Sequence, residues 1–259
     1  MKLKGTVAII TGASRGLGRA SAVEMAREGA HLVILSRTAP DIEATSRMVE
    51  EVGGEVLSLQ GDISRSKDVQ EAVDKAQSHF GKIDILMNNA AVIGPVKPLF
   101  EVDEQDWDIC MDINVKGSFL FSKAVIPHMI RRKRGKIINV TSGLGAMAMP
   151  RFGGNSIAKA GVIHLTRILA EELKPHNIQV NGLDPGVMDT KMQEDLRNLG
   201  PDVLGDAIYA EFSGYKEKGI LKPPERVAKL AVFLASEASD SITGENGTES
   251  HYKRFGYKG

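Results

Sequence analysis

A glycine-rich stretch near the N-terminus has the residue types and the spacing to hold a phosphate group. Residues 11–18 lie between a β-branched run and a helical pattern, and three of them are glycines. Glycines at this spacing permit a tight turn and a close approach of the backbone to a pyrophosphate, and the helix N-terminus supplies unpaired N–H groups. The residues predicted to line this phosphate site are Gly12, Ser14, Arg15, Gly16, Leu17 and Gly18.

Two other interpretations of this stretch are possible. Residues 12–16 also match the Gly-x-Ser-x-Gly elbow that carries a hydrolase nucleophile, which would be Ser14. That elbow does not need the further glycine at Gly18, and it normally follows a later strand than the first. A glycine-rich turn that merely packs a helix on a sheet is the second alternative. The position directly after the first predicted strand favours the dinucleotide site.

The end of the second predicted strand indicates which dinucleotide is preferred. An acidic residue at this position would bind the ribose 2′-hydroxyl of NAD. Residues 35–38 read Leu-Ser-Arg-Thr and contain no acid. Arg37, together with Arg15 in the glycine-rich turn, can instead clamp a 2′-phosphate. We therefore predict that Ser36 and Arg37 bind the cofactor and that NADP(H) is favoured over NAD(H).

Further polar motifs follow the later strands. The third is followed by Asp62 and Ile63, the fourth by Asn89, Ala90 and Ala91, the fifth by Ser142, and the sixth by Pro185, Gly186, Val187 and Thr190, while Asn114 and Lys159 fall in two helical patterns. In this order and at this spacing, over about residues 5–235, the motifs resemble the short-chain dehydrogenase/reductase family. Similar members of this family include 3-oxoacyl-carrier-protein reductases, polyol and gluconate dehydrogenases and steroid dehydrogenases.

The resemblance implies hydride transfer between a nicotinamide cofactor and a ketone or secondary alcohol. It implies that Asp62, with Ile63 beside it, binds the adenine, that Asn89, Ala90 and Ala91 flank the cofactor, and that Pro185, Gly186, Val187 and Thr190 contact its nicotinamide end. It further implies that Ser142 orients the substrate carbonyl, that Lys159 binds the nicotinamide ribose, and that Asn114 holds a water of a proton relay. The family usually has glycine where Ala91 stands.

One departure from the family concerns the acid–base residue. The family has a tyrosine four residues before the lysine, and Asn155 stands there in this chain. A phenol beside a lysine cation can titrate toward working pH, whereas an amide can only form hydrogen bonds. Because general acid catalysis typically contributes about 10²–10⁴-fold, we predict severely reduced hydride transfer with intact cofactor binding.

Three explanations for Asn155 remain open. The first is an engineered substitution that traps a complex in an otherwise active enzyme, and the second is a natural pseudoenzyme that binds NADP(H) for regulation or scaffolding. In the third, Tyr209 or Tyr215 reaches in as a substitute acid. All four tyrosines of the chain lie in its last fifth. The retained catalytic positions favour the ancestry of an active enzyme.

Short β-branched runs alternate with helical patterns along most of the chain. Strands are predicted over residues 6–10, 31–35, 55–60, 83–88, 136–140 and 178–183, and helices over 16–28, 42–52, 69–80, 107–131 and 156–173. This alternation predicts an α/β fold, a single Rossmann-type domain over residues 1–259 with a doubly wound parallel sheet and helices on both faces. Residues 188–221 break the alternation and are interpreted as a helical substrate flap.

The residues expected around the reacting carbon are mostly apolar. If the family geometry holds, they are Leu144, Met147, Met149, Phe152, Met188 and Met192. Methionines form an adaptable apolar wall, so a largely apolar ketone or secondary alcohol fits better than a sugar phosphate. The alternative is that these methionines only fill gaps in the core.

Composition narrows the remaining classes. Lys plus Arg and Asp plus Glu are both 33, so the balance is neutral and a nucleic-acid partner is not expected. The single cysteine, Cys110, excludes an intramolecular disulfide, and no metal site is predicted. No apolar run is long enough for a signal peptide or a membrane span, so a cytoplasmic protein without a membrane partner is expected. The resemblance implies a homodimer or homotetramer in which the helices near residues 107 and 156 meet a partner copy.

Overall fold

Aliphatic runs form the strands of the central sheet. The computed structural model describes residues 1–259 and contains one seven-stranded sheet in the order β3-β2-β1-β4-β5-β6-β7, with every pair parallel. The strands are β1 (Val7–Thr11), β2 (His31–Ser36), β3 (Val56–Gln60), β4 (Ile85–Asn88), β5 (Gly135–Val140), β6 (Ile178–Leu183) and β7 (Asn246–Gly247). β1 is buried along its whole length, because both faces of the sheet are covered.

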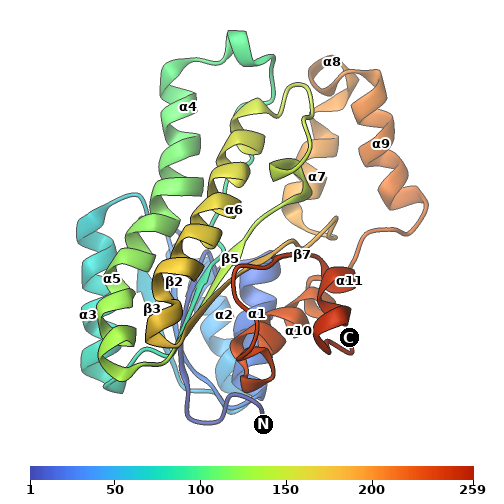
Figure 1. Cartoon of the computed structure of the whole chain (residues 1–259). Coiled ribbons are helices and arrows are strands. Elements are labelled where there is room, and N and C mark those ends of the chain that lie inside the picture. Colours follow the sequence, from blue (N-terminus) through green and yellow to red (C-terminus); the bar gives the residue numbers. More distant parts are fainter.

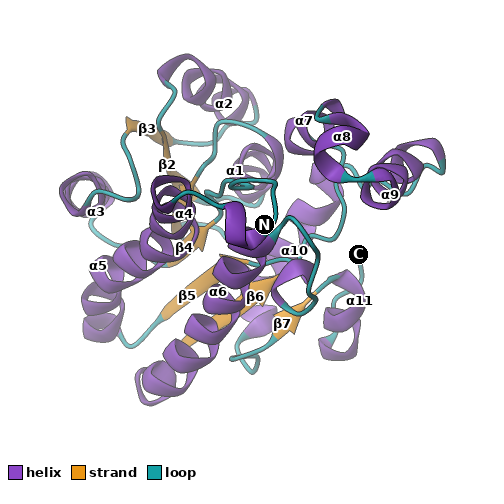
Figure 2. Ribbon diagram, turned by 90° about the horizontal axis from the view of Figure 1, so that it is seen from above, coloured by secondary structure: helices purple, strands orange, loops and turns teal.

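Helices cover both faces of the sheet (Figure 1). They are α1 (Gly16–Arg27), α2 (Ala39–Glu51), α3 (Ser66–Phe80), α4 (Glu104–Met111), α5 (Gly117–Arg132), α6 (Gly153–Leu173), α7 (Lys191–Asn198), α8 (Gly200–Leu204), α9 (Asp206–Glu217), α10 (Pro224–Ala235) and α11 (Glu249–Tyr252). Figure 2 shows α1, α2 and α10 on one side of the sheet and α3, α5 and α6 on the other. A hydrophobic core lies on each face of the sheet, and successive residues of β1 pack into different cores. Ile9 packs on the α5 side and Ile10 on the α1 side. The predicted doubly wound α/β fold is confirmed.

The elements differ from the prediction mainly around residues 104–132 and in the C-terminal part of the chain. The expected helix over 107–131 is a longer helical region, in which α4 and α5 are joined by a π-helical turn, Asp112–Lys116. β7, α10 and α11 were not predicted. β7 has two residues, which is too short to show an alternating pattern, and Asn246 and Gly247 pair with Gly182 and Leu183 of β6.

Three helices lie beyond the carboxyl edge of the sheet (Figure 1). α7, α8 and α9 belong to the predicted flap region, 188–221, and share a small apolar cluster of Phe152, Leu196, Leu204 and Phe212. The base of this region is closed by a bridge between Met188 and Lys222. No helix combines the length and the apolar character needed to cross a bilayer.

A buried carboxylate ties the amino end of the sheet together. Asp84 accepts hydrogen bonds from the Val7 N–H at 2.9 Å and from Arg132 Nη1 at 2.7 Å, and it lies 3.2 Å from Lys82 Nζ. Its side chain is 6% exposed. Burial by itself raises the pKa of Asp84, but the Val7 N–H and the two cations outweigh it, and the pKa lies below its ordinary value. The contact joins β1, β4 and α5, and it also gives Arg132, one of four consecutive basic residues, a partner inside the chain.

We expect Asp84→Ala to lower the free energy of unfolding by about 2 kcal/mol, because it leaves the buried Val7 N–H without an acceptor. Since the folded state lowers the pKa of this carboxyl, its stabilisation is present above the ordinary pKa of about 4 and is lost as the pH falls through the lowered value. Urea denaturation at neutral and acid pH measures both effects. Asp103→Ala, which removes the exposed partner of Lys97, should leave the urea midpoint unchanged. An equal midpoint for the two variants at neutral pH would contradict this account.

Candidate active site

The site begins where the strand order reverses. β1 lies between β2 and β4 in the sheet. The connections that follow β1 and β4 leave toward opposite faces of the sheet and open a crevice at the carboxyl ends of these two strands. Thr11 Oγ1 accepts the N–H groups of Asn89 at 3.0 Å and Ala90 at 3.1 Å. Asn89 Nδ2 in turn donates to the carbonyl oxygens of Thr11 at 2.9 Å and Gly12 at 3.1 Å. These four bonds hold the ends of β1 and β4 together under the crevice.

The glycines of the β1–α1 turn are required by close packing. Gly12 has φ +64°, and a Cβ there would lie 2.7 Å from Ala90 Cα. A Cβ on Gly18 would lie 2.4 Å from the Gly12 carbonyl oxygen and 2.5 Å from Asn89 Nδ2. α1 begins at Gly16, and its N-cap residue, Arg15, makes no side-chain capping bond. The first N–H groups of α1 are therefore free to bind an anion, which fits a pyrophosphate.

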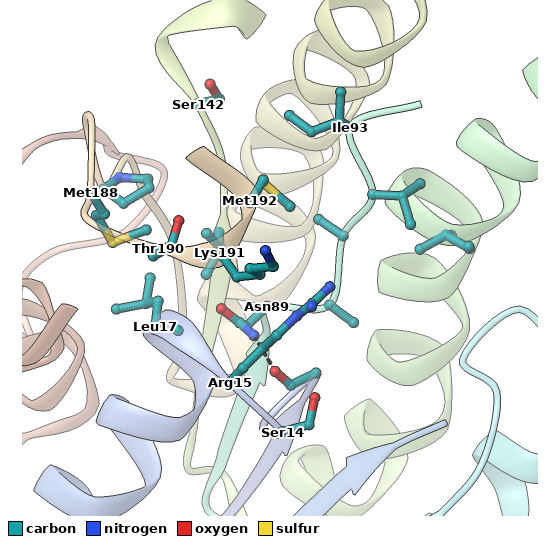
Figure 3. A pocket seen from close by; sticks show the side chains of 18 of the residues that line it. Ser14, Arg15, Leu17, Asn89, Ile93, Ser142, Met188, Thr190, Lys191 and Met192 are labelled. Carbon is teal, nitrogen blue, oxygen red and sulfur yellow. Dashed lines mark hydrogen bonds between the residues drawn. The ribbon is translucent and has the colours of Figure 1, made fainter. Parts of the chain in front are cut away.

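A cleft of about 390 Å³ runs from this turn along the carboxyl ends of the strands. Figure 3 shows its wall, with Ser14 and Arg15 on the β1–α1 turn, Leu17 at the start of α1, Met188 and Thr190 on the segment after β6, and Lys191 and Met192 at the start of α7. The predicted residues that line it are Gly12, Ser14, Arg15, Gly16, Leu17, Ser36, Arg37, Asp62, Ile63, Asn89, Ala90, Ala91, Ser142, Asn155, Lys159, Pro185, Gly186 and Thr190. The structure thus brings most of the predicted site residues to one cavity.

Three of the predicted cofactor-binding and catalytic residues do not line the cleft. Gly18 lies behind the turn, where it allows Asn89 to approach. Asn114 lies in the π-helical turn, and its amide is engaged by one backbone unit, accepting from the Val92 N–H at 3.1 Å and donating to the Val92 carbonyl at 3.0 Å. Val187 accepts the N–H of Lys222 at 3.0 Å through its own carbonyl. These residues support the wall of the cleft instead of facing it.

The end of the cleft near β2 and β3 carries the predicted adenine-binding residues. Asp62 accepts from the N–H and the hydroxyl of Ser64 at 2.9 Å and 2.7 Å. Burial by itself raises the pKa of Asp62, but these bonds and the nearby Arg37 and Arg65 lower it overall. Asp41 lines this end as well. Asp41 was not predicted as a site residue because it lies in the first turn of α2 and not at a strand end.

The opposite end of the cleft holds the predicted catalytic residues. Lys159 and Asn155 are four residues apart on α6, so they share one helix face. Lys159 Nζ donates to the Val140 carbonyl at 2.7 Å, and burial lowers the pKa of this lysine to about 8. An ammonium has three donors, so two remain for a ligand. Ser142, at the end of β5, accepts the N–H of Leu144 at 3.2 Å and keeps its own hydroxyl proton to donate.

Asn155 provides no titratable group at this end. Its side chain is 5% exposed and donates from Nδ2 to the Val92 carbonyl at 3.0 Å, the same oxygen that Asn114 binds. Two amides thus converge on one backbone carbonyl beside Lys159. An amide neither releases nor accepts a proton near neutral pH. The side chain that stands four residues before Lys159 can therefore orient a ligand but cannot protonate it.

No tyrosine lines the cleft. The Tyr215 hydroxyl donates to Glu211 on the same helix, and this bond together with burial raises the pKa of Tyr215 to about 12. Tyr209 packs against the small apolar cluster of the α7–α9 region. Tyr252 is buried and donates to the Gly182 carbonyl at 2.7 Å. In this structure neither Tyr209 nor Tyr215 reaches the position of a substitute acid.

The wall on the α7–α9 side is apolar, as predicted, but its members differ in part. Of the predicted residues, Leu144, Phe152, Met188 and Met192 line the cleft, and they are joined by Ile93, Leu196 and Phe212. Met147 is instead 61% exposed and Met149 packs against the apolar cluster, so neither lines the cleft. Leu196 and Phe212 were missed because their contribution depends on how α7 and α9 fold back over the site.

The sheet is doubly wound, and an uncapped helix follows the glycine-rich turn at its switch point, with a buried lysine in the same cleft. These features fit a protein that binds a dinucleotide. The family model described as short chain dehydrogenase matches residues 6–199. The chain belongs to the short-chain dehydrogenase/reductase family, whose proteins bind nicotinamide cofactors and act on alcohols and ketones.

Individual relatives match over nearly the whole chain. The 3-oxoacyl-acyl-carrier-protein reductase FabG of Thermotoga maritima is 33% identical over 245 residues, covering 95% of this chain and 96% of its own. The crystal structure of levodione reductase superposes with a TM-score of 0.89 at 28% identity, covering 98% of this chain and 100% of its own. NAD⁺-bound xylitol dehydrogenase has a TM-score of 0.87 at 28% identity, covering 96% and 98%.

We expect Gly18→Ala to weaken the binding of a nicotinamide dinucleotide at least about tenfold, which is about 1.4 kcal/mol. The added methyl group would overlap the Gly12 carbonyl and Asn89 Nδ2 and must displace the β1–α1 turn, where the pyrophosphate is expected to bind. Fluorescence titration with NADPH and NADH measures the effect. Gly214→Ala is the matched control, because the nearest atom to its new Cβ is Lys218 Nζ at 3.9 Å. Unchanged affinity in the Gly18 variant would contradict the assignment of the turn.

Proposed function

We propose that this chain is an NADP(H)-dependent oxidoreductase of the short-chain type, in which the acid–base step is disabled at Asn155. The observation that carries the proposal is the convergence of Ser142 and Lys159 with the free N-terminus of α1 in one cleft. The substrate would be a small ketone or secondary alcohol. We include in the proposal that residues 1–259 form one domain and that residues 188–221 act as its substrate flap.

Some residues of this chain would hold the cofactor, and others would orient the substrate. The bound cofactor would supply or accept the hydride. Lys159 would donate from Nζ to the hydroxyls of the nicotinamide ribose while its third donor stays on the Val140 carbonyl. The Ser142 hydroxyl would donate to the substrate oxygen, on which negative charge develops during reduction. Asn155 would offer an amide where a proton donor is needed, so the alkoxide must take its proton from solvent.

The cofactor preference rests on charge at the β2 end of the cleft. Ser36 is the last residue of β2 and Arg37 follows it, with no acidic residue at either position, and Arg15 lies in the glycine-rich turn. Two guanidinium groups favour a 2′-phosphate over a ribose hydroxyl. Asp41, in the first turn of α2, also lines the cleft, and its carboxylate would favour NAD(H) instead. The two arginines outweigh Asp41 in setting the cofactor preference.

The apolar wall supports a largely apolar substrate. Ile93, Leu144, Phe152, Met192, Leu196 and Phe212 surround the end of the cleft that holds Ser142. Among the similar structures, one is named as a reductase of levodione and another as a dehydrogenase of xylitol. The exposed side chains of Ile109, Phe119, Ile157 and Ile168 on α4, α5 and α6 support the proposal of a homodimer or homotetramer through these helices.

A second candidate function is a non-catalytic NADP(H)-binding protein with a regulatory or scaffolding role. It is favoured by Asn155 and by the absence of any tyrosine from the cleft. Both candidates bind the cofactor, so binding alone does not separate them. They differ in whether the cleft turns over a substrate once an acid is restored.

We expect Asn155→Tyr to raise the rate of NADPH oxidation by about 100-fold or more on at least one ketone or oxo-ester, because it restores a phenol beside the buried Lys159. Steady-state assays of both proteins against a substrate panel measure the gain. Asn155→Phe restores the ring without the hydroxyl and should remain slow. Turnover at an ordinary rate of about 10 s⁻¹ by the unmodified chain would refute the disabled step. Cofactor binding without any gain in the tyrosine variant would favour the non-catalytic candidate.

We expect Arg37→Ala to weaken NADPH binding about tenfold and to leave NADH binding within about twofold, since one charged contact to the 2′-phosphate is removed. Parallel calorimetric titrations with the two cofactors provide the comparison. Lys4→Ala, at an exposed position outside the cleft, controls for the loss of one positive charge. Equal losses for both cofactors would contradict the role of Arg37 in discriminating between them.

A further inference from the structure

The segment after β6 forms one wall of the cleft and is held from outside by a neighbouring residue. Gly186, Met188 and Thr190 line the cleft. Lys222 donates its N–H to the Val187 carbonyl at 3.0 Å and accepts the Asp189 N–H at 2.9 Å. Its ammonium approaches the same segment, because a Cβ built on Gly186 would lie 3.4 Å from Lys222 Nζ. Lys222 thus contacts the wall through both its backbone and its side chain.

The Lys222 side chain is in turn held by the C-terminal helix. Glu249, the first residue of α11, places Oε2 3.0 Å from Lys222 Nζ, and its Oε1 accepts from Arg226 Nε at 3.1 Å. The Glu249 side chain is 7% exposed, whereas that of Arg226 is 60% exposed. Burial alone raises the pKa of Glu249, but the two cations lower it overall, so the carboxylate is charged. A buried charge therefore faces Lys222 from behind the wall.

α11 is itself fixed to the sheet, which gives Glu249 a defined position. The Tyr252 hydroxyl donates to the Gly182 carbonyl of β6 at 2.7 Å and lies 3.1 Å from the Glu245 carbonyl. Tyr252 is fully buried. The contacts therefore run from β6 through Tyr252 to α11, from Glu249 to Lys222, and from Lys222 to the segment after β6.

We infer that Glu249 is a positioning residue for the nicotinamide side of the cleft, acting through Lys222 on residues 185–190. The inference rests on the proposed cofactor and assigns a role to the C-terminal segment. Glu249 does not itself line the cleft. Without its carboxylate the Lys222 ammonium loses its buried partner, and the wall that contacts the nicotinamide half becomes less ordered. The β1–α1 turn, which Asn89 holds, is unaffected.

The test compares two ligands that share the adenine end of the cofactor. NADPH reaches both ends of the cleft, whereas adenosine 2′,5′-bisphosphate lacks the nicotinamide half. We expect Glu249→Gln to weaken NADPH binding about tenfold and to leave the bisphosphate affinity unchanged in calorimetric titrations. Arg254→Gln is the matched control, because it removes a charge from the same tail by breaking the 2.8 Å pair with Glu245 and does not touch Lys222. It should leave both affinities unchanged.

A double variant tests the path of the effect. If Glu249 acts through Lys222, then Glu249→Gln combined with Lys222→Met should bind NADPH no more weakly than the Lys222 variant alone. Additive losses in the double variant would overturn the inference. So would equal losses of NADPH and bisphosphate affinity in Glu249→Gln, which would indicate a general structural effect, and so would an unchanged NADPH affinity.

The same titrations separate this inference from the proposed function. Failure of the unmodified protein to bind either NADPH or NADH would overturn the proposed function and the inference with it. Normal binding by the unmodified protein with no difference in Glu249→Gln would overturn the inference alone. Thermal unfolding of every variant shows that the protein titrated is folded.

Discussion

The side chain of Asn89 binds the carbonyl oxygens of Thr11 and Gly12, and Thr11 Oγ1 binds the N–H groups of Asn89 and Ala90. This reciprocal pair spans the two central strands at the point where the sheet order reverses. The arrangement leaves no space for a Cβ at Gly12 or Gly18, and it fixes the direction in which α1 leaves the turn. The free N–H groups of α1, the crevice above them and the order of residues along it all depend on this contact.

The rest of the cleft is built by supports that lie behind its wall. Asn114 and Asn155 hold the Val92 backbone, the Val140 carbonyl holds Lys159, and Lys222 holds the segment after β6. These supports leave Ser142 and two donors of Lys159 free to meet a ligand. The same arrangement explains how the chain can keep a complete binding cleft while Asn155 removes the proton donor. Binding and proton transfer depend on different residues.

Much of the fold and of the cleft could be predicted from local sequence patterns. The first six strands, the glycine-rich turn and the polar residues that end the strands carry signals within a few residues of one another. The two-residue β7 and the short α11 carry no such signal, and their places depend on pairing with β6. Phe212 and Glu249 were missed because each acts on a segment far away in the chain, and Asp41 was missed because it lies in the first turn of α2 and not at a strand end. The orientation of Asn114 toward Val92 depends on the π-helical turn, which no periodicity predicts.

The crystal structure of this chain with NADPH would test the central claim most directly. The account predicts the pyrophosphate on the N–H groups at the start of α1, the adenine end beside Asp62 and Arg37, and the nicotinamide between Lys159 and Gly186. It also predicts that the Asn155 amide and the Ser142 hydroxyl face the open side of the nicotinamide ring, with no tyrosine among them. A dinucleotide bound outside this cleft, or a tyrosine hydroxyl beside the nicotinamide, would contradict it.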